Sequence, residues 1–281
     1  MLPHVLSAKG VHAGRVSVRR SFRVPDIFGF DSREPALIPQ ANAAVVQSRA
    51  DTHDQQERPR EALYSEVPGW LESILVCPIC KGSVQKAGSS YSCRLCSREY
   101  PVRYGIPDFR LHPDPYISIE DELAKIEKLF DGRGKSFHEL LSAYYDLSPE
   151  NPPSLNHHYI SAMDSAVGRG RGLLQRLIAR FPKMSRIRLL DLGCGTGGML
   201  AASVDKFERA VGVDVALRWM LIGRQRLREL GLDVPLVCAN AESLPFAART
   251  FDAVTADAVL EHVREPAAMR DETMQVLQSG G

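Results

Sequence analysis

Apolar residues in the second half of the chain follow two different spacings. Four short apolar runs have the length and composition of buried strands: 187–192, 210–213, 236–239 and 251–256. Two other stretches, 198–205 and 217–230, repeat apolar residues at helical spacing, and Gly231 ends the second of them. Strands that alternate with helices form a parallel sheet covered by helices, so this half of the chain predicts an α/β fold.

Residues 113–185 have helical spacing and are predicted to form a helical linker or cap. Ser118 and Asp121 form a predicted capping box ahead of an apolar helical face, which consists of Leu123, Ile126, Leu129 and Phe130. The proline-rich segment 148–154 then breaks the helical pattern. A loop or a fraying turn is predicted at three glycines: Gly168, Gly170 and Gly172. A further helix follows, with an apolar face formed by Leu173, Leu174, Leu177, Ile178 and Phe181.

The first 66 residues show no sustained strand or helix period, and we predict that residues 1–66 form a disordered tail. Residues 1–24 contain several basic residues and no acidic residue, which is faintly similar to an organelle transit peptide. They lack the compact apolar segment of a secretory signal. A disordered tail is the favoured interpretation.

The composition is that of an ordinary soluble protein, with 44% hydrophobic and 25% charged residues. The net charge of +1 provides no general attraction to nucleic acid or to a membrane, so any basic binding surface has to be local. No apolar run approaches the length of a membrane span, and we expect a cytoplasmic protein with no membrane partner. The six cysteines are then expected to be reduced or bound to metal.

Two Cys-x-x-Cys pairs stand in residues 67–112, and their members are Cys77, Cys80, Cys93 and Cys96. Each pair places two sulfurs on one tight turn, and a hairpin between the turns can bring all four sulfurs together. Zn²⁺ prefers four thiolates in a tetrahedron, so we predict a zinc ribbon over residues 67–112. Four protein ligands leave no open position, and the metal is therefore expected to be structural. Redox dithiols or plain buried cysteines are the alternative.

The ribbon also resembles a known family through two segments: Ile-Leu-Val-Cys-Pro-Ile-Cys-Lys-Gly at 74–82 and Tyr-Pro-Val-Arg-Tyr-Gly-Ile-Pro at 100–107. They are similar to the zinc ribbon of the small activator proteins that partner tRNA, rRNA and protein methyltransferases. They also resemble the ribbon fused ahead of some bacterial rRNA guanine methyltransferases. Tyr104 departs from the family, which often has an acidic residue there. The resemblance implies a module that supports a methyltransferase domain, contacts its substrate or binds a protein partner.

A glycine-rich segment, Asp191-Leu-Gly-Cys-Gly-Thr-Gly197, follows the first predicted strand and opens a helix. Glycines at such a turn let backbone amides approach a ligand. Gly193, Gly195 and Gly198 also fit the dinucleotide-binding spacing, so an NAD-binding protein is one alternative. Asp191 argues against it, because a carboxylate there suits a cationic amino group and would repel a pyrophosphate. Asp214 ends the second strand, where it can accept hydrogen bonds from both ribose hydroxyls.

These residues, with Asn240-Ala-Glu-Ser-Leu-Pro-Phe246 and residues 251–263, resemble class I S-adenosylmethionine-dependent methyltransferases of the type 11 branch. The resemblance covers residues 186–281 and implies a Rossmann-like sheet that binds S-adenosyl-L-methionine. It implies the following contact residues: Asp191, Gly193, Gly195 and Gly197 for the methionine end, Asp214 for the ribose, Ala241 and Glu242 for the adenine, and Asp257 for the active-site loop. Asn240 replaces the usual aspartate, a change that can weaken the contact with the adenine amino group, although the amide oxygen can still accept that bond.

Methyl transfer from a sulfonium mainly requires alignment of donor and acceptor, and it needs a base only where the acceptor loses a proton. Asp257 and His262 are the candidates for such a catalytic residue, although a histidine at the position of His262 more often marks the start of a helix. A second histidine cluster either lies over the cofactor or belongs to an amphipathic helix: His157, His158 and Tyr159. Four residues near the motifs are predicted to serve in packing: Cys194, Cys238, Trp219 and Met220.

In the family, the turn at the end of the present sequence leads into a fifth strand and two more. We therefore expect a sheet that is incomplete on its C-terminal side, with the fourth strand as an exposed edge and with marginal stability and low turnover. The leading hypothesis is a methyltransferase that acts on a small molecule or on RNA. The alternative is a non-catalytic zinc-ribbon adaptor or a truncated methyltransferase remnant.

Overall fold

The computed structural model describes residues 67–131, 134–148, 151–180, 187–203 and 206–279, all of which belong to the unit Gln56–Gly281. The tail predicted for residues 1–66 lies outside these ranges, as do Phe181 and the end of the helix predicted for 198–205. None of the helices in these ranges combines the length and apolar character that crossing a bilayer requires.

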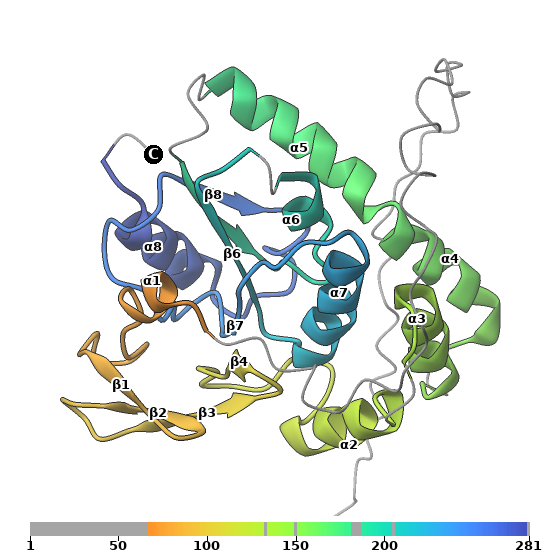
Figure 1. Ribbon diagram of the computed structural model, residues 1–281, viewed down its shortest axis with the longest axis horizontal. Coiled ribbons are helices and arrows are strands. Elements are labelled where there is room, and N and C mark those ends of the chain that lie inside the picture. The colour runs from red at the N-terminus through yellow and green to blue at the C-terminus, as the bar shows by residue number, and fades with distance from the viewer. Residues whose placement is uncertain (1–66, 132–133, 149–150, 181–186, 204–205, 280–281) are drawn as a thin grey trace, which may run out of the picture. The chain divides into compact units, whose positions relative to one another are not determined.

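The second half of the chain forms the α/β fold that its hydrophobic pattern predicts (Figure 1). Its parallel sheet has the strand order β7-β6-β5-β8. The strands are β5 (Arg188–Leu192), β6 (Arg209–Asp214), β7 (Leu236–Cys238) and β8 (Ala253–Ala256). The helices that follow β5, β6 and β8 are α6 (Gly198–Ser203), α7 (Leu217–Glu229) and α8 (Pro266–Val276). Helices cover the faces of the sheet, so central residues such as Leu189, Leu190 and Val211 are fully buried.

The cysteine-rich region forms a small antiparallel sheet with the strand order β1-β2-β3-β4. A short helix, α1 (Gly69–Glu72), precedes the strands β1 (Val84–Ala87), β2 (Ser90–Cys93), β3 (Glu99–Arg103) and β4 (Ile106–Pro107). Phe109 packs against two tyrosines of this sheet, with its ring centroid 5.7 Å from that of Tyr91 and 4.7 Å from that of Tyr100. These aromatic rings give the small sheet an apolar side.

Backbone pairing joins the two sheets. Asp108 pairs in parallel with Cys238 at the end of β7, and Phe109 N donates to Cys238 O at 2.7 Å. In addition, Leu75 pairs in antiparallel fashion with Phe246 in the loop after β7. One hydrophobic core therefore contains buried residues from both regions, among them Leu71, Cys77, Tyr91 and Phe109 together with Leu190, Val213 and Phe246.

Between the two sheets, the described part of the sequence forms the helices α2 (Ile119–Leu129), α3 (Phe137–Asp146), α4 (Pro153–Asp164) and α5 (Ala166–Arg180). Ser118 caps α2 as predicted, since its Oγ accepts from Asp121 N at 3.1 Å. The complete capping box, in which the side chains and backbones of Ser136 and Glu139 bond to each other, lies at the start of α3. The hydrophobic pattern did not predict a capping box at this position. Tyr159 in α4 stacks on Tyr145 in α3 at a centroid distance of 5.6 Å, so the packing interpretation of α4 is the one that this structure favours.

The turn predicted at Gly168, Gly170 and Gly172 is wrong, because all three glycines lie inside α5. Gly170 lies against the start of α6, where a Cβ added to it would come within 2.7 Å of Gly198 O and of Met199 Cα. Glycine therefore lets α5 and α6 approach more closely than any side chain would allow.

The exposed edge expected for the fourth strand is covered at its beginning. Strand β8 starts at Ala253, two residues later than the predicted run, and Phe251 pairs in parallel with Leu277. Gln278 N also donates to Phe251 O at 2.8 Å. The segment that follows α8 thus adds a short stretch of pairing on the side of the sheet opposite to β5.

Candidate functional site

The turn between β5 and α6 carries the predicted glycine-rich loop to the carboxyl ends of the strands. Gly193, Gly195 and Gly197 have positive φ angles of 66°, 47° and 72°, which glycine adopts without steric cost. Gly193 is covered by Val259 from the segment after β8, whose Cγ2 would lie 2.4 Å from an added Cβ. Around Gly195 the nearest such atom is 3.9 Å away, so Gly195 is the least crowded of the three.

Asp191 lies at the end of β5 next to this loop and is 4% exposed. Its Oδ1 accepts a hydrogen bond from Thr255 Oγ1 at 2.7 Å. Burial raises the pKa of Asp191 to about 7, against the opposing effect of the Thr255 bond and with smaller contributions from the Asp214 and Asp257 carboxylates. No basic side chain in the described part of the chain is paired with Asp191, and such a site favours a cationic ligand group.

Asp214 ends β6 and faces the same loop. Its Oδ2 accepts from Gly195 N and its Oδ1 accepts from Ala216 N, both at 2.8 Å. Burial raises the pKa of Asp214, and these two backbone bonds oppose the rise. Each oxygen retains a further lone pair, so the carboxylate can still accept hydrogen bonds from two neighbouring hydroxyl groups.

The loop after β7 carries Ala241 and Glu242, which are both partly exposed. Glu242 Oε1 accepts from Arg264 N at 2.7 Å and so ties this loop to the segment after β8. The Asn240 amide oxygen, which the family resemblance places near the adenine amino group, already has two backbone donors. Asn240 Oδ1 accepts from Leu111 N at 2.8 Å and from His112 N at 3.1 Å, which uses both of its lone pairs.

The two catalytic candidates lie in the segment between β8 and α8. Asp257 Oδ2 is 3.9 Å from Arg169 Nε of α5, and both side chains are about half exposed. His262 Nδ1 is 2.9 Å from Tyr116 Oη, and the two rings meet edge to face. The helix-start interpretation of His262 is wrong, because α8 begins at Pro266 and His262 occupies a turn before it. Both candidates are open to solvent in the free protein.

The four predicted metal ligands come together at the two turns of the ribbon. The Sγ atoms of Cys77, Cys80, Cys93 and Cys96 all lie within 4.8 Å of one another. Zn–S bonds of about 2.3 Å in a tetrahedron separate the sulfurs by about 3.8 Å, close to the 3.7 Å between Cys77 and Cys96. The arrangement and chemistry of these donors therefore fit Zn²⁺.

Hydrogen-bond donors surround the sulfurs as well. The amides of Leu95 and Cys96 donate to Cys93 Sγ at 3.4 Å, and Tyr100 Oη lies 3.1 Å from Cys77 Sγ. Burial opposes ionisation of Cys77, but hydrogen bonds from the Cys80 amide and from Tyr100 outweigh it and lower the pKa of Cys77 to about 6. These donors stabilise thiolates, which are the form that binds a metal.

The other two cysteines are predicted to serve in packing, and the structure buries both. Burial raises the pKa of the Cys194 and Cys238 thiols well above the ordinary value, with nearby carboxylates as smaller causes. A buried thiol with a raised pKa is a poor nucleophile.

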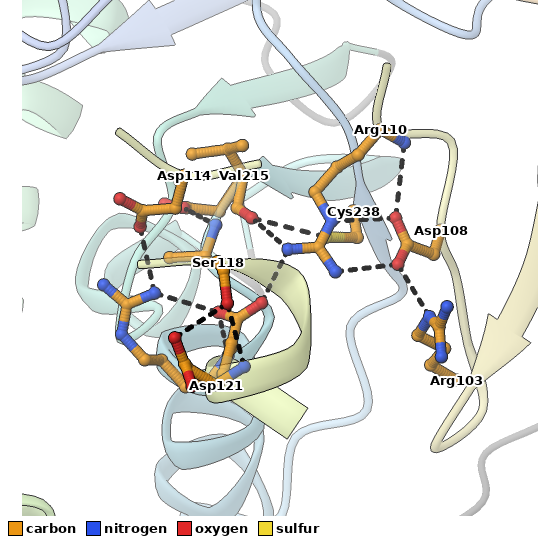
Figure 2. A network of polar contacts seen from close by, with 12 residues as sticks. Arg103, Asp108, Arg110, Asp114, Ser118, Asp121, Val215 and Cys238 are labelled. Atoms are coloured by element: carbon orange, nitrogen blue, oxygen red, sulfur yellow. Dashed lines mark hydrogen bonds and ion pairs between the residues drawn. The ribbon is translucent and has the colours of Figure 1, made fainter. Parts of the chain in front are cut away.

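A chain of buried, alternating charges lies beside Val215, the residue that follows Asp214 (Figure 2), and we call it the buried charge network: Asp108, Arg110, Asp114, Glu122 and Arg218. Arg110 donates to both oxygens of Asp108, at 2.9 and 2.8 Å, and to Glu122 Oε2 at 2.6 Å. Glu122 Oε1 accepts from Arg218 Nη1 at 2.9 Å, and the same Nη1 lies 2.9 Å from Asp114 Oδ2. Each member of the network thus faces at least one opposite charge, as buried charges require.

Sequence reasoning missed this network because its members stand far apart in the chain. Glu122 and Arg218 are separated by 96 residues, and nothing local marks either as buried. The only local signal is the pair Asp108 and Arg110 directly after the last ribbon strand.

Comparisons with known proteins agree with this geometry over part of the chain. Residues 190–281 match the family model described as a methyltransferase domain. The ubiquinone biosynthesis O-methyltransferase of Ruegeria sp. (strain TM1040) is 34% identical over 96 residues, which are 34% of this chain and 38% of that protein. The demethylmenaquinone methyltransferase of Clavibacter sepedonicus is 41% identical over 95 residues, again 34% of this chain and 38% of that protein.

Solved structures that match part of the chain include the YcgJ protein of Bacillus subtilis. It is 26% identical, with a TM-score of 0.38, and the match covers 41% of this chain and 48% of that one. The chain spans less than two fifths of the length of the curated relatives that it matches. The expected resemblance to methyltransferases is thus confirmed for the domain in residues 190–281.

Proposed function

We propose that this chain carries the donor-binding domain of an S-adenosyl-L-methionine-dependent methyltransferase, and that residues 186–281 bind the methyl donor. One observation carries the proposal, namely the placement of two carboxylates around the glycine-rich loop. Asp191 is buried at the start of this loop without a basic partner among the described residues, and Asp214 accepts from the amide of Gly195 inside it. The match to a methyltransferase domain supports the same assignment.

The two carboxylates suit different parts of this ligand. Asp191 has no cationic partner among the residues that the structure describes, and the ligand's ammonium group would supply one. Asp214 is placed to accept hydrogen bonds from the two ribose hydroxyls, with its orientation fixed by the amides of Gly195 and Ala216. When bound, the sulfonium supplies an activated methyl group for in-line transfer. The remaining task of the chain is to align the acceptor and to exclude water.

The acceptor that we propose is a small molecule of the quinone type. Two matched relatives are named for ubiquinone biosynthesis and for demethylmenaquinone methylation, which favours a small molecule over RNA. Asp257 and His262 are the proposed acceptor-side residues, because they lie in the segment after β8 that also covers the glycine-rich loop through Val259. His262 can act as a base if the acceptor has to lose a proton.

We also propose that the ribbon holds one structural Zn²⁺ through Cys77, Cys80, Cys93 and Cys96. The four sulfurs lie within 4.8 Å of one another, and Cys93 Sγ accepts hydrogen bonds from the amides of Leu95 and Cys96. Four protein sulfurs leave no position for a substrate, so this metal has no direct part in the reaction.

The test of the methyl-donor site is calorimetry with S-adenosylhomocysteine and with NAD on one preparation of the whole chain. We expect the chain to bind S-adenosylhomocysteine and to discriminate against NAD. The substitution Asp214→Ala removes charge-assisted hydrogen bonds worth roughly 1.5–3 kcal/mol each, and it should weaken binding about ten- to a hundredfold.

The matched control is Asp271→Ala, which removes a carboxylate that is 67% exposed and paired only with its neighbour Arg270. This variant should bind like the unmodified chain. A preference for NAD, or equal binding by the Asp214→Ala variant, would overturn the assignment.

A further inference from the structure

The buried charge network comes mostly from outside the matched domain. Asp108, Arg110, Asp114 and Glu122 lie between the last ribbon strand and the first turn of α2, whereas the matched domain begins at residue 190. The side chains of Arg110 and Glu122 are 1% and 0% exposed. Removing two such charges from water costs free energy, and their mutual attraction offsets this cost only when further hydrogen bonds satisfy their remaining donors and acceptors. The other contacts of Arg110 and Glu122 therefore show which parts of the protein the two side chains stabilise.

Arg110 reaches the turn that follows Asp214. Its Nη1 donates to Val215 O at 3.0 Å, in addition to its bonds with Asp108 and Glu122. The only other bond to this carbonyl among the described residues is a weak one from Cys238 Sγ at 3.6 Å. Arg110 thus fixes the peptide group directly after the carboxylate that we assign to the ribose (Figure 2).

Glu122 holds the other end of the same turn. Helix α7 begins at Leu217, and Ala216 at its N-cap position offers no side-chain acceptor. Glu122 Oε1 accepts from the backbone amide of Arg218 at 3.2 Å and so provides the missing acceptor from another helix. A carboxylate at this end of a helix is also favoured by the helix dipole.

We propose that Arg110 and Glu122 are positioning residues for ribose recognition. They hold the turn from Asp214 to Arg218 at both of its ends, so that the Asp214 carboxylate points at the two ribose hydroxyls. This inference rests on the proposed function, and it deepens it by assigning part of the ligand selectivity to residues outside the methyltransferase domain. Neither residue contacts the ligand itself.

Arg103 offers a matched comparison within the same network. Its Nε donates to Asp108 Oδ2 at 3.0 Å, but its side chain is 32% exposed and has no bond to Val215 or to Glu122. Loss of Arg103 therefore removes one of the two arginine partners of Asp108 and leaves the contacts that hold the turn after Asp214 unchanged.

The experiment compares S-adenosylhomocysteine with its 2′-deoxy analogue by calorimetry on the whole, zinc-loaded chain. The ratio of the two dissociation constants reports ribose recognition, whereas a general loss of stability weakens both ligands alike. Arg110→Lys keeps a positive charge but cannot make the forked contact together with the bond to Val215. Glu122→Gln keeps the size of the side chain and serves as the second variant. Arg103→Gln is the control.

We expect Arg110→Lys and Glu122→Gln to lower the discrimination between the two ligands by roughly five- to tenfold, mainly through weaker binding of S-adenosylhomocysteine. Arg103→Gln should keep the discrimination of the unmodified chain. If both ligands weaken in parallel and the ratio is preserved, the inference is overturned and the two residues are merely structural. If the unmodified chain binds neither ligand, the proposed function fails, and this inference fails with it.

Discussion

Asp191 combines two properties that rarely coexist in a stable protein, since it is a carboxylic acid that is buried and has no cationic partner among the described residues. Burial favours the neutral form, and the pKa of about 7 places its ionisation near neutral pH. In the free protein the raised pKa means that this group stabilises the fold most below about pH 4, and that its contribution is lost as the pH rises through about 7. A ligand that brings a positive charge to Asp191 reverses the preference.

Binding of S-adenosylhomocysteine should therefore depend on pH. Below pH 7 the ligand has to displace the proton on Asp191, so we expect its affinity to fall by up to about tenfold for each pH unit. Above the pKa the affinity should level off. Asp191→Asn should bind more weakly at pH 8 and should show little pH dependence, which calorimetry between pH 5.5 and pH 8 measures. An affinity of the unmodified chain that stays constant across this range would contradict the role given to Asp191.

The site residues differ in how well the sequence could predict them. The placement of Asp191 and Asp214 beside the glycine-rich loop was predictable, because their spacing from the glycines and from the strand ends is a local feature of the chain, whereas their roles in binding stay predictions. The role that we propose for Arg110 was not predictable, because it depends on a hydrogen bond to Val215, which is 105 residues away. The engagement of Asn240 by Leu111 and His112 escaped prediction for the same reason.

The parallel sheet was predictable because its strands are short, continuous apolar runs separated by helical spacing. Helix α5 was only partly predictable, since Gly168, Gly170 and Gly172 reduce its intrinsic helix propensity. Packing against α6 compensates for this cost, because Gly170 allows the two helices to touch through their backbones. The local sequence predicted a turn at these glycines, whereas the tertiary contact between α5 and α6 stabilises a continuous helix.

Two single substitutions in α5 separate these effects. Gly170→Ala should destabilise the protein by roughly 1–3 kcal/mol, because the added Cβ lies 2.7 Å from backbone atoms of α6. Gly172→Ala is the control, since no atom lies within 4 Å of its added Cβ, and it should stabilise the helix by about 0.5–1 kcal/mol. Urea unfolding monitored by circular dichroism measures both. Equal stability of the two variants would show that the contact between α5 and α6 is looser than described.

The ribbon should carry about one zinc ion per chain when it is prepared under reducing conditions. Cys77→Ser and Cys93→Ser each remove one of four ligands and should lose the metal, together with the local structure of the small sheet. Metal analysis and tyrosine fluorescence follow these two changes. A reduced, freshly prepared protein without zinc would refute the metal assignment.

Hydrogen bonds connect the ribbon to the parallel sheet through the loop after β7, which carries Ala241 and Glu242. Lys81, between the two pairs of cysteines, donates to Leu244 O at 3.0 Å and to Glu272 Oε2 at 2.7 Å. Glu272 Oε2 also accepts from Leu244 N at 2.8 Å, and Leu75 pairs with Phe246 just beyond. The geometry of this loop therefore depends on the geometry of the metal turns.

Loss of zinc should accordingly weaken binding of S-adenosylhomocysteine, although no cysteine of the metal site lies in the proposed ligand site. We expect a roughly tenfold loss after chelation, and a smaller loss for Lys81→Met with zinc still bound. Lys86→Met is the control, because Lys86 pairs only with Glu72 inside the ribbon region. Calorimetry of the chelated and zinc-loaded forms provides the test. Identical affinity in the two forms would show that the ribbon and the ligand site are independent.

The pairing of the ribbon with the sheet also bears on how the chain folds during synthesis. The metal turns close through partners only 13 to 19 residues apart, whereas Lys81 and Glu272 are separated by 191 residues. Contacts of such high sequence separation form late, because a long loop has to be ordered before they contribute. The ribbon therefore leaves the ribosome before the strands of the parallel sheet, and its apolar side, with Tyr91 and Phe109, then still lacks the sheet that buries it. Until the last strand and α8 are made, the nascent chain exposes this surface, and chaperones that bind apolar segments have their best opportunity during that interval.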